Sequence, residues 1–196
     1  MENIDIEGNN KLPDTIEFIG DRAFSTPTAS IESSSTNLVP EKLKLNELPK
    51  NLKFIGAYAF YMNNVSTNTG NPGIVITTIP VNLKFIPIWC FSRLPNVSIV
   101  EFGSSTNGLE VIDKGAFSNC GGNTITQIII NNSIAILARE SGYAAIGAFS
   151  NYSPLSPSIS VIANKKLTEI MDISGTFYSA VDDWSATGLN YSQTES

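Results

Sequence analysis

A short pattern recurs four times in this chain, and its repetition limits the fold more than any other feature. Each copy has a Leu or Ile, an Ile three residues later, and a closing Ala-Phe or Cys-Phe pair. One unit of such a repeat cannot bury its own apolar face, so neighbouring units must stack. The sequence therefore predicts a repeat solenoid. The copies are Ile16–Phe24, Leu52–Phe60, Leu83–Phe91 and Leu109–Phe117.

A second pattern precedes each copy, and consists of two apolar residues with one residue between them. This period-two alternation predicts a short, half-buried strand. A degraded fifth copy closes at Phe149, and a weaker sixth at Phe177. We therefore expect five to six repeats. Their predicted starts are Ile4, Leu43, Ile74, Val97, Ile128 and Ile159.

The segment between each strand and its Phe contains a corner and a bend. Pro13, Pro49 and Pro80 follow the predicted strands, and proline ends a strand because it has no N–H to donate. The Leu-x-x-Ile segment that comes next fits an extended wall and a helical turn equally well. The Ala-Phe pair predicts a helical or 3₁₀ turn in which each Phe stacks on the Phe of the next repeat.

The composition excludes several functional classes. Hydrophobic residues make up 42% of the 196 residues, enough for a continuous core. The net charge of -6 argues against a nucleic-acid surface. No apolar run approaches the roughly 20 residues of a membrane span, and the first residues lack the basic and apolar parts of a signal peptide, so we expect neither feature in the chain as given. Histidine is absent, as are phosphate-binding and hydrolase motifs, so we expect no enzyme and no cofactor.

The two cysteines and the acidic C-terminal residues each have a structural interpretation beside a chemical one. Cys90 replaces the Ala of other copies and is expected in the core; a disulfide to Cys120 stays open, and a zinc site is disfavoured. Asp182 and Asp183 beside Trp184 resemble a carboxylate or calcium site, but a polar cap over the last repeat explains them better. We therefore assign 1–179 to the solenoid and 180–196 to a C-terminal cap or tail.

The outward side of the predicted strands is the candidate binding surface. Stacked strands bring equivalent side chains to about 4.8 Å, so Val75, Val100, Ile129 and Ile162 form an apolar patch if they point outward. The alternative is that loops cover them, or that β-branched residues are there only as good strand formers. One predicted row holds Asp5, Lys44, Val75, Ser98, Ile129 and Ser160, and the next holds Glu7, Asn46, Thr77, Val100, Asn131 and Ile162. The predicted contact residues are the middle four of each row.

The repeat resembles the BspA-like, or treponemal-type, family of leucine-rich repeats. The resemblance rests on Leu48-Pro-x-x-Leu52-x-x-Ile55-Gly56-x-x-Ala59-Phe60 and on the matching copy that ends at Phe117. It extends from about Ile4 to Phe149 and more weakly to Phe177, with Pro87 and Cys90 as departures. It implies a right-handed curved coil with a parallel sheet on one face, no catalytic residues, and a secreted or cell-surface location.

The resemblance also implies adhesion or host-protein binding as the function. We expect a protein ligand, such as a host extracellular protein, and further domains in a longer exported precursor. One alternative is a structural spacer, in which outward residues are freely replaceable. Another is a glycan-binding module, which needs exposed aromatic side chains on one face, such as Tyr58, Tyr61, Trp89 or Trp184.

Overall fold

The computed structural model describes the repeats most fully from the first copy to the fourth. The described residues are 11–25, 45–61, 76–94, 97, 99, 101–103, 108–118, 120, 127–131, 133–138, 147–149, 160–163, 171 and 190–193.

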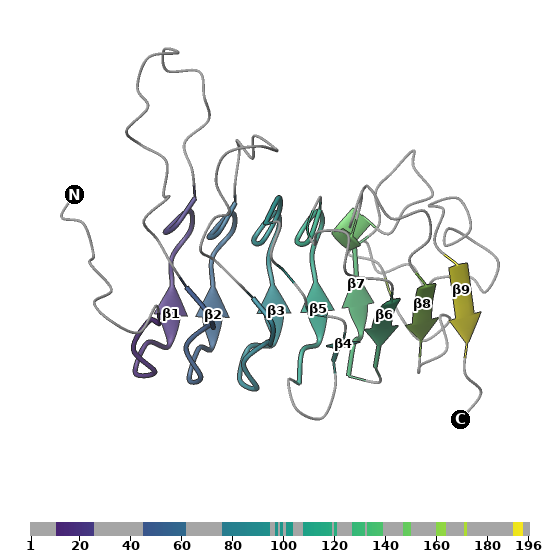
Figure 1. Ribbon diagram of the computed structural model, residues 1–196, viewed down its shortest axis with the longest axis horizontal. Coiled ribbons are helices and arrows are strands. Elements are labelled where there is room, and N and C mark those ends of the chain that lie inside the picture. Colours follow the sequence, from purple (N-terminus) through teal and green to yellow (C-terminus); the bar gives the residue numbers. More distant parts are fainter. Residues whose placement is uncertain are drawn as a thin grey trace, which may run out of the picture.

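The Leu-x-x-Ile segments form one set of parallel strands, here called wall A. Five strands lie side by side and run in the same direction in Figure 1. β1 pairs with β2, and β5 lies between β3 and β7. The Leu-x-x-Ile segment, whose sequence fitted an extended wall and a helical turn equally well, is therefore extended. The strands are β1 (Phe18–Ile19), β2 (Phe54–Ile55), β3 (Phe85–Ile86), β5 (Val111–Ile112) and β7 (Ile136–Leu137).

The predicted upstream strands form a second parallel set, here called wall B. Its sheet has the order β4-β6-β8-β9, and β6, β8 and β9 run opposite to wall A in Figure 1. Bridges from Lys11 to Glu47 and from Ile76 to Val97 occur before the proline corners of earlier repeats. Strands thus form on two walls, not one face. They are β4 (Glu101–Phe102), β6 (Gln127–Ile130), β8 (Ser160–Ala163) and β9 (Asn190–Gln193), the last inside the segment assigned to a cap or tail.

The proline corners between the walls are present as predicted. In each, the proline carbonyl accepts a hydrogen bond from the residue three positions later. The donors are the N–H groups of Ile16, Leu52 and Leu83, at 3.1, 3.1 and 3.0 Å. A proline can accept here although it cannot donate, so the corner uses the group that proline retains.

A tight turn follows wall A, and its third residue has a positive φ. The fourth repeat uses Gly115 there, at φ 63°, whereas Arg22, Tyr58 and Trp89 adopt φ 55–57°. A positive φ at this place is the signature of a type II turn, and it costs a residue with a Cβ about 1–2 kcal/mol. The helical or 3₁₀ turn predicted for the Ala-Phe pair is therefore a tight turn in the first four copies, and among the described copies the fifth closes with a 3₁₀ helix, η1 (Gly147–Phe149).

Hydrogen bonds between these turns join each repeat to the next, and we call them the turn ladder. Two N–H groups of every turn donate to carbonyl groups of the following turn. The first bonds run from Arg22 to Ala57, Tyr58 to Ile88, Trp89 to Lys114 and Gly115 to Gly147, at 2.7–3.1 Å. The second run from Phe24 to Ala59, Phe60 to Cys90, Phe91 to Ala116 and Phe117 to Ala148, at 2.8–2.9 Å.

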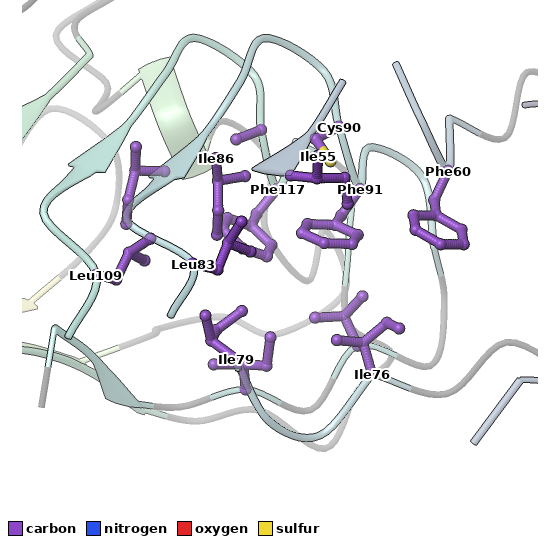
Figure 2. Packing of buried hydrophobic residues seen from close by; sticks show 14 of the residues in the cluster. Ile55, Phe60, Ile76, Ile79, Leu83, Ile86, Cys90, Phe91, Leu109 and Phe117 are labelled. Carbon is purple, nitrogen blue, oxygen red and sulfur yellow. The ribbon is translucent and has the colours of Figure 1, made fainter. Parts of the chain in front are cut away.

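The closing phenylalanines form a stacked column in the core. Phe24, Phe60, Phe91, Phe117 and Phe149 have successive centroid distances of 5.0, 5.7, 5.4 and 5.5 Å. Figure 2 shows three of these rings between buried residues of both walls. The predicted stacking is therefore confirmed.

Wall A is interrupted between β2 and β3, and Pro87 explains the break. At the equivalent position, the N–H groups of Gly56, Asp113 and Ala138 donate to the preceding repeat at 2.8–2.9 Å. Pro87 has no N–H, so this bond is absent and the two strands belong to separate sheets. The turn ladder and the Phe column continue across the break.

Both cysteines are free and buried. Cys90 takes the place of a core alanine, and the Cys120 thiol donates to the Phe91 carbonyl at 2.7 Å. Burial raises the pKa of Cys90 well above its usual value and that of Cys120 to about 12. A thiol that stays protonated is a poor nucleophile, so these cysteines are packing residues.

Gly56 should tolerate alanine far less well than Gly20, although both occupy the same place in the repeat. A Cβ on Gly56 lies 2.3 Å from the backbone nitrogen of Asp21, whereas one on Gly20 meets only the Phe18 ring at 3.7 Å. We expect Gly56→Ala to lower the free energy of unfolding by about 1–3 kcal/mol. Gly20→Ala should leave it unchanged or raise it by up to about 1 kcal/mol. Urea unfolding of both variants measures this difference, and equal losses would contradict the close approach.

Alkaline pH should destabilise the chain partly through Cys90. The thiol of the unfolded chain ionises near its usual pKa of 9.0, whereas burial raises the folded pKa well above that value. The folded state thus keeps a proton that the unfolded state loses, so stability is intact below pH 9 and falls as the pH rises toward the folded pKa. In Cys90→Ala, this decline should be shallower by about 1.4 kcal/mol per pH unit.

The comparison is made by urea unfolding of both proteins from pH 7 to 11. The two proteins differ only at residue 90, so the difference between the two slopes isolates the Cys90 thiol. Parallel slopes would show that Cys90 ionises in the folded state.

Candidate binding surface

The outward side of wall A carries a row of apolar side chains, here called the Phe row: Phe18, Phe54, Phe85, Val111 and Ile136. The three phenylalanines are 64%, 45% and 38% exposed, and the last two residues are half-buried. Each precedes a buried Ile or Leu of the same strand, so the alternation of a strand turns it outward. Most large apolar side chains in the described residues are in the core, so this row is a departure that calls for an explanation.

Backbone register fixes the geometry of the row. Phe18 is paired with Phe54, Phe85 with Val111, and Val111 with Ile136. The Phe18 and Phe54 rings are stacked at 4.8 Å between centroids, 5° from parallel. This distance equals the usual spacing of neighbouring strands, about 4.7–4.9 Å, so the strands themselves set the stack.

Ion pairs border the row on one side. The residue before each Phe is charged, and Lys53 Nζ lies 2.9 Å from Glu17 Oε2. Lys84 Nζ lies 3.2 Å from Glu110 Oε1 and also donates to the Gly108 carbonyl. Exposed pairs of this kind add about 0–1 kcal/mol to stability. Their arrangement is that of a polar rim beside an apolar strip.

The structure locates half of the binding residues predicted from sequence. Asn46 and Thr77 are exposed, while Ile129 and Asn131 are half-buried, and Asn131 Nδ2 donates to Glu101 Oε1 at 2.9 Å. Lys44, Val75, Ser98 and Val100 lie outside the described residues. The predicted set is thus brought together only in part, and its role stays a prediction.

The predicted register of wall B was wrong at β4. Ile129 was aligned with Ser98, but the structure pairs it with Glu101, and Phe102 with Ile130. The alternation at Val97 and Ile99 gave the correct inward residues, because both are buried. It did not reveal that the chain runs three residues further before pairing with β6. Alternation predicts which side of the sheet a residue faces, but it does not predict which residue of the neighbouring strand is its pairing partner.

A second group of partly exposed side chains gathers at the turns after β1, β2 and β3. We call it the turn cluster: Arg22, Tyr58, Tyr61, Trp89 and Arg93. The Tyr61 ring meets Tyr58 at 5.6 Å and Trp89 at 6.2 Å, edge to face in both cases. The guanidinium of Arg22 lies 4.6 Å from the Tyr58 ring, and that of Arg93 lies 5.9 Å from the Tyr61 ring. Three of the four aromatic residues named as examples for the glycan hypothesis are therefore together, and they are half-buried; Trp184 lies outside the described residues.

Sequence analysis missed the Phe row because it left the Leu-x-x-Ile segment undecided. A helical turn has no outward row at this position, so Phe18, Phe54 and Phe85 were not weighed as surface residues. A usable signal was present, since three copies place Phe directly before the buried Ile. An extended wall turns adjacent residues to opposite sides, and one of each pair must then face outward.

In the part of the chain that is described, no three His, Cys, Asp or Glu side chains are grouped as a metal ion would require. Those residues also include no helix with the length and apolar character of a membrane span.

Comparison with known proteins gives one match. The family model of the BspA type leucine rich repeat region matches six copies, over residues 5–141 and 70–174. No curated protein and no solved structure matches significantly. Repeats of this family typically act as non-enzymatic protein-interaction modules and are common in surface and secreted proteins. The matched residues span most of the sequence, and the chain therefore belongs to the BspA-type leucine-rich repeat family.

Proposed function

We propose that this chain is a non-enzymatic adhesion module that binds a protein ligand through the Phe row. The observation that carries the proposal is the exposure of Phe18, Phe54 and Phe85 on neighbouring strands of wall A. Aromatic side chains, including Phe, are enriched at the core of protein interfaces relative to the rest of the protein surface. A partner that covers these rings would gain about 25 cal/mol for each Å² of apolar surface removed from water.

Preorganisation strengthens this proposal. Phe18 and Phe54 are already stacked, and their strands are joined by backbone hydrogen bonds. A side chain that is held in place before binding loses little conformational entropy when a partner arrives. The bordering pairs Glu17–Lys53 and Lys84–Glu110 offer both signs of charge to polar groups of the partner.

The proposal includes the wider architecture predicted from sequence. Five to six repeats over 1–179 would form a right-handed curved solenoid, with 180–196 completing its end. The module would belong to a longer secreted or surface protein, and a host extracellular protein is the expected ligand. Asn46, Thr77, Ile129 and Asn131, with the four undescribed residues of that set, remain a second predicted contact surface on wall B.

The double variant Phe18→Ser/Phe54→Ser should lose ligand binding and keep its fold. Both rings are exposed, so we expect the removal of their stack to cost about 1 kcal/mol of stability. Binding to a panel of purified extracellular proteins, measured by surface plasmon resonance, should weaken at least tenfold for any ligand of the wild-type chain. Circular dichroism and urea unfolding verify the fold.

The matched control is Asn46→Arg/Thr77→Arg, which alters two exposed residues of the other predicted surface. It should bind like the wild type if the Phe row is the site. Loss of binding in this control alone would transfer the site to wall B. A wild-type chain that binds no protein on the panel would favour the spacer function.

A further inference from the structure

Backbone strain is concentrated in the turn cluster. Among the described residues, the non-glycine residues with positive φ are Arg22, Tyr58, Trp89 and Arg93, at 55–64°, and all four belong to the cluster. Gly115 occupies the same turn position as the first three and shows that glycine fits there. Residues in such conformations persist where the surrounding structure holds them in place, and they cluster at ligand-binding and catalytic sites.

The cluster presents three aromatic rings and two guanidinium groups on adjacent turns. Tyr61 joins Tyr58 to Trp89 by edge-to-face contacts, so the ring planes alternate in direction. Arg22 is exposed, and the other four residues are half-buried. Trp89 is supported from beneath, because a Cβ on Gly115 would lie within 2.9–3.1 Å of its ring atoms. The rings are thus braced and still reach solvent.

The charge around the cluster differs from that of the whole chain. The chain carries a net charge of -6, but Arg22 and Arg93 are both here, with Lys114 on the next turn. The nearby carboxylates of Asp21 and Asp113 accept backbone hydrogen bonds from Ala57 and Lys114. Arg22 contacts the Tyr58 ring, whereas Lys11, Lys53 and Lys84 are in salt bridges with carboxylates.

We propose that the turn cluster is a binding site for a carboxylated saccharide, distinct from the Phe row. A sugar ring has an apolar C–H face that packs on an aromatic ring, and its hydroxyl groups suit phenol and indole partners. A guanidinium binds a carboxylate through two parallel hydrogen bonds. A polynucleotide, with a charge on every residue, is disfavoured by the acidic chain, whereas a sugar with one carboxylate needs only the local cations.

The test is isothermal titration calorimetry of the intact chain with two acidic saccharides and a neutral counterpart. Sialyllactose and trigalacturonate carry their carboxylates on different sugars, and lactose carries none. We expect binding of at least one acidic saccharide, at least tenfold tighter than lactose and weaker at high salt. Binding of neither acidic saccharide, or equal binding of lactose, would overturn the proposal.

Arg22→Gly is the main variant, because glycine relieves the positive φ and the side chain is exposed. It should fold like the wild type and bind the acidic saccharide at least tenfold more weakly. Trp89→Gly should abolish binding. Lys50→Ala removes one exposed positive charge from a proline corner and should bind like the wild type. Undiminished binding by Arg22→Gly, or equal loss in Lys50→Ala, would refute the site.

An acidic peptide is the remaining competitor for the same cations. Oligoglutamate offers carboxylates without a sugar ring, so it tests whether the aromatic rings contribute. Binding of oligoglutamate as tightly as the acidic saccharide would overturn the saccharide assignment. The Phe18→Ser/Phe54→Ser variant should keep its saccharide binding, and this result separates the turn cluster from the protein-binding proposal.

Discussion

The turn ladder is the interaction on which the rest of this structure depends. Each turn donates two backbone hydrogen bonds, and the acceptors belong to the following repeat. An intramolecular hydrogen bond adds about 0.5–1.5 kcal/mol to stability, and a repeat taken alone would lack both bonds that its turn makes to the next. The same bonds place each closing Phe over the next, which builds the column from Phe24 to Phe149. Hydrogen bonding and apolar packing therefore require the same stacking of neighbours.

The break at Pro87 shows which contacts are essential to stacking. Wall A loses a hydrogen bond there and divides into two sheets, but the turns on both sides remain bonded from Tyr58 to Ile88 and from Phe60 to Cys90. Phe60 and Phe91 still stack across the same junction. The strands of wall A can therefore lose their pairing at one junction without breaking the stack. The turn-ladder bonds, by contrast, are present at every described junction between the first five copies. This explains why the closing Phe was the most regular signal in the sequence.

What the sequence predicted, and what it did not, follows from how local each feature is. Proline corners and the Phe column were predictable because a single residue type determines each. The register of β4 was not, since Val97, Ile99 and Phe102 all face inward and only the partner strand selects among them. The strained turns were also hidden, because Arg22, Tyr58 and Trp89 are poor choices for a positive φ. Aligning them with Gly115 was the one signal that pointed to this conformation.

Both candidate surfaces arise because a repeat copies one position into neighbouring strands or turns. Phe18 and Arg22, Phe54 and Tyr58, and Phe85 and Trp89 are each separated by the same step, so two rows run across the first three repeats. Backbone hydrogen bonds set the spacing between Phe18 and Phe54 and between the successive turns that carry Arg22, Tyr58 and Trp89. Phe54 and Phe85 lie on strands that the break at Pro87 separates. Their chemistry differs: one is apolar with paired charges, and the other is aromatic with arginines. A scaffold of this kind can therefore change one surface by substitution without moving the other, because the positions that form the ladder are backbone groups.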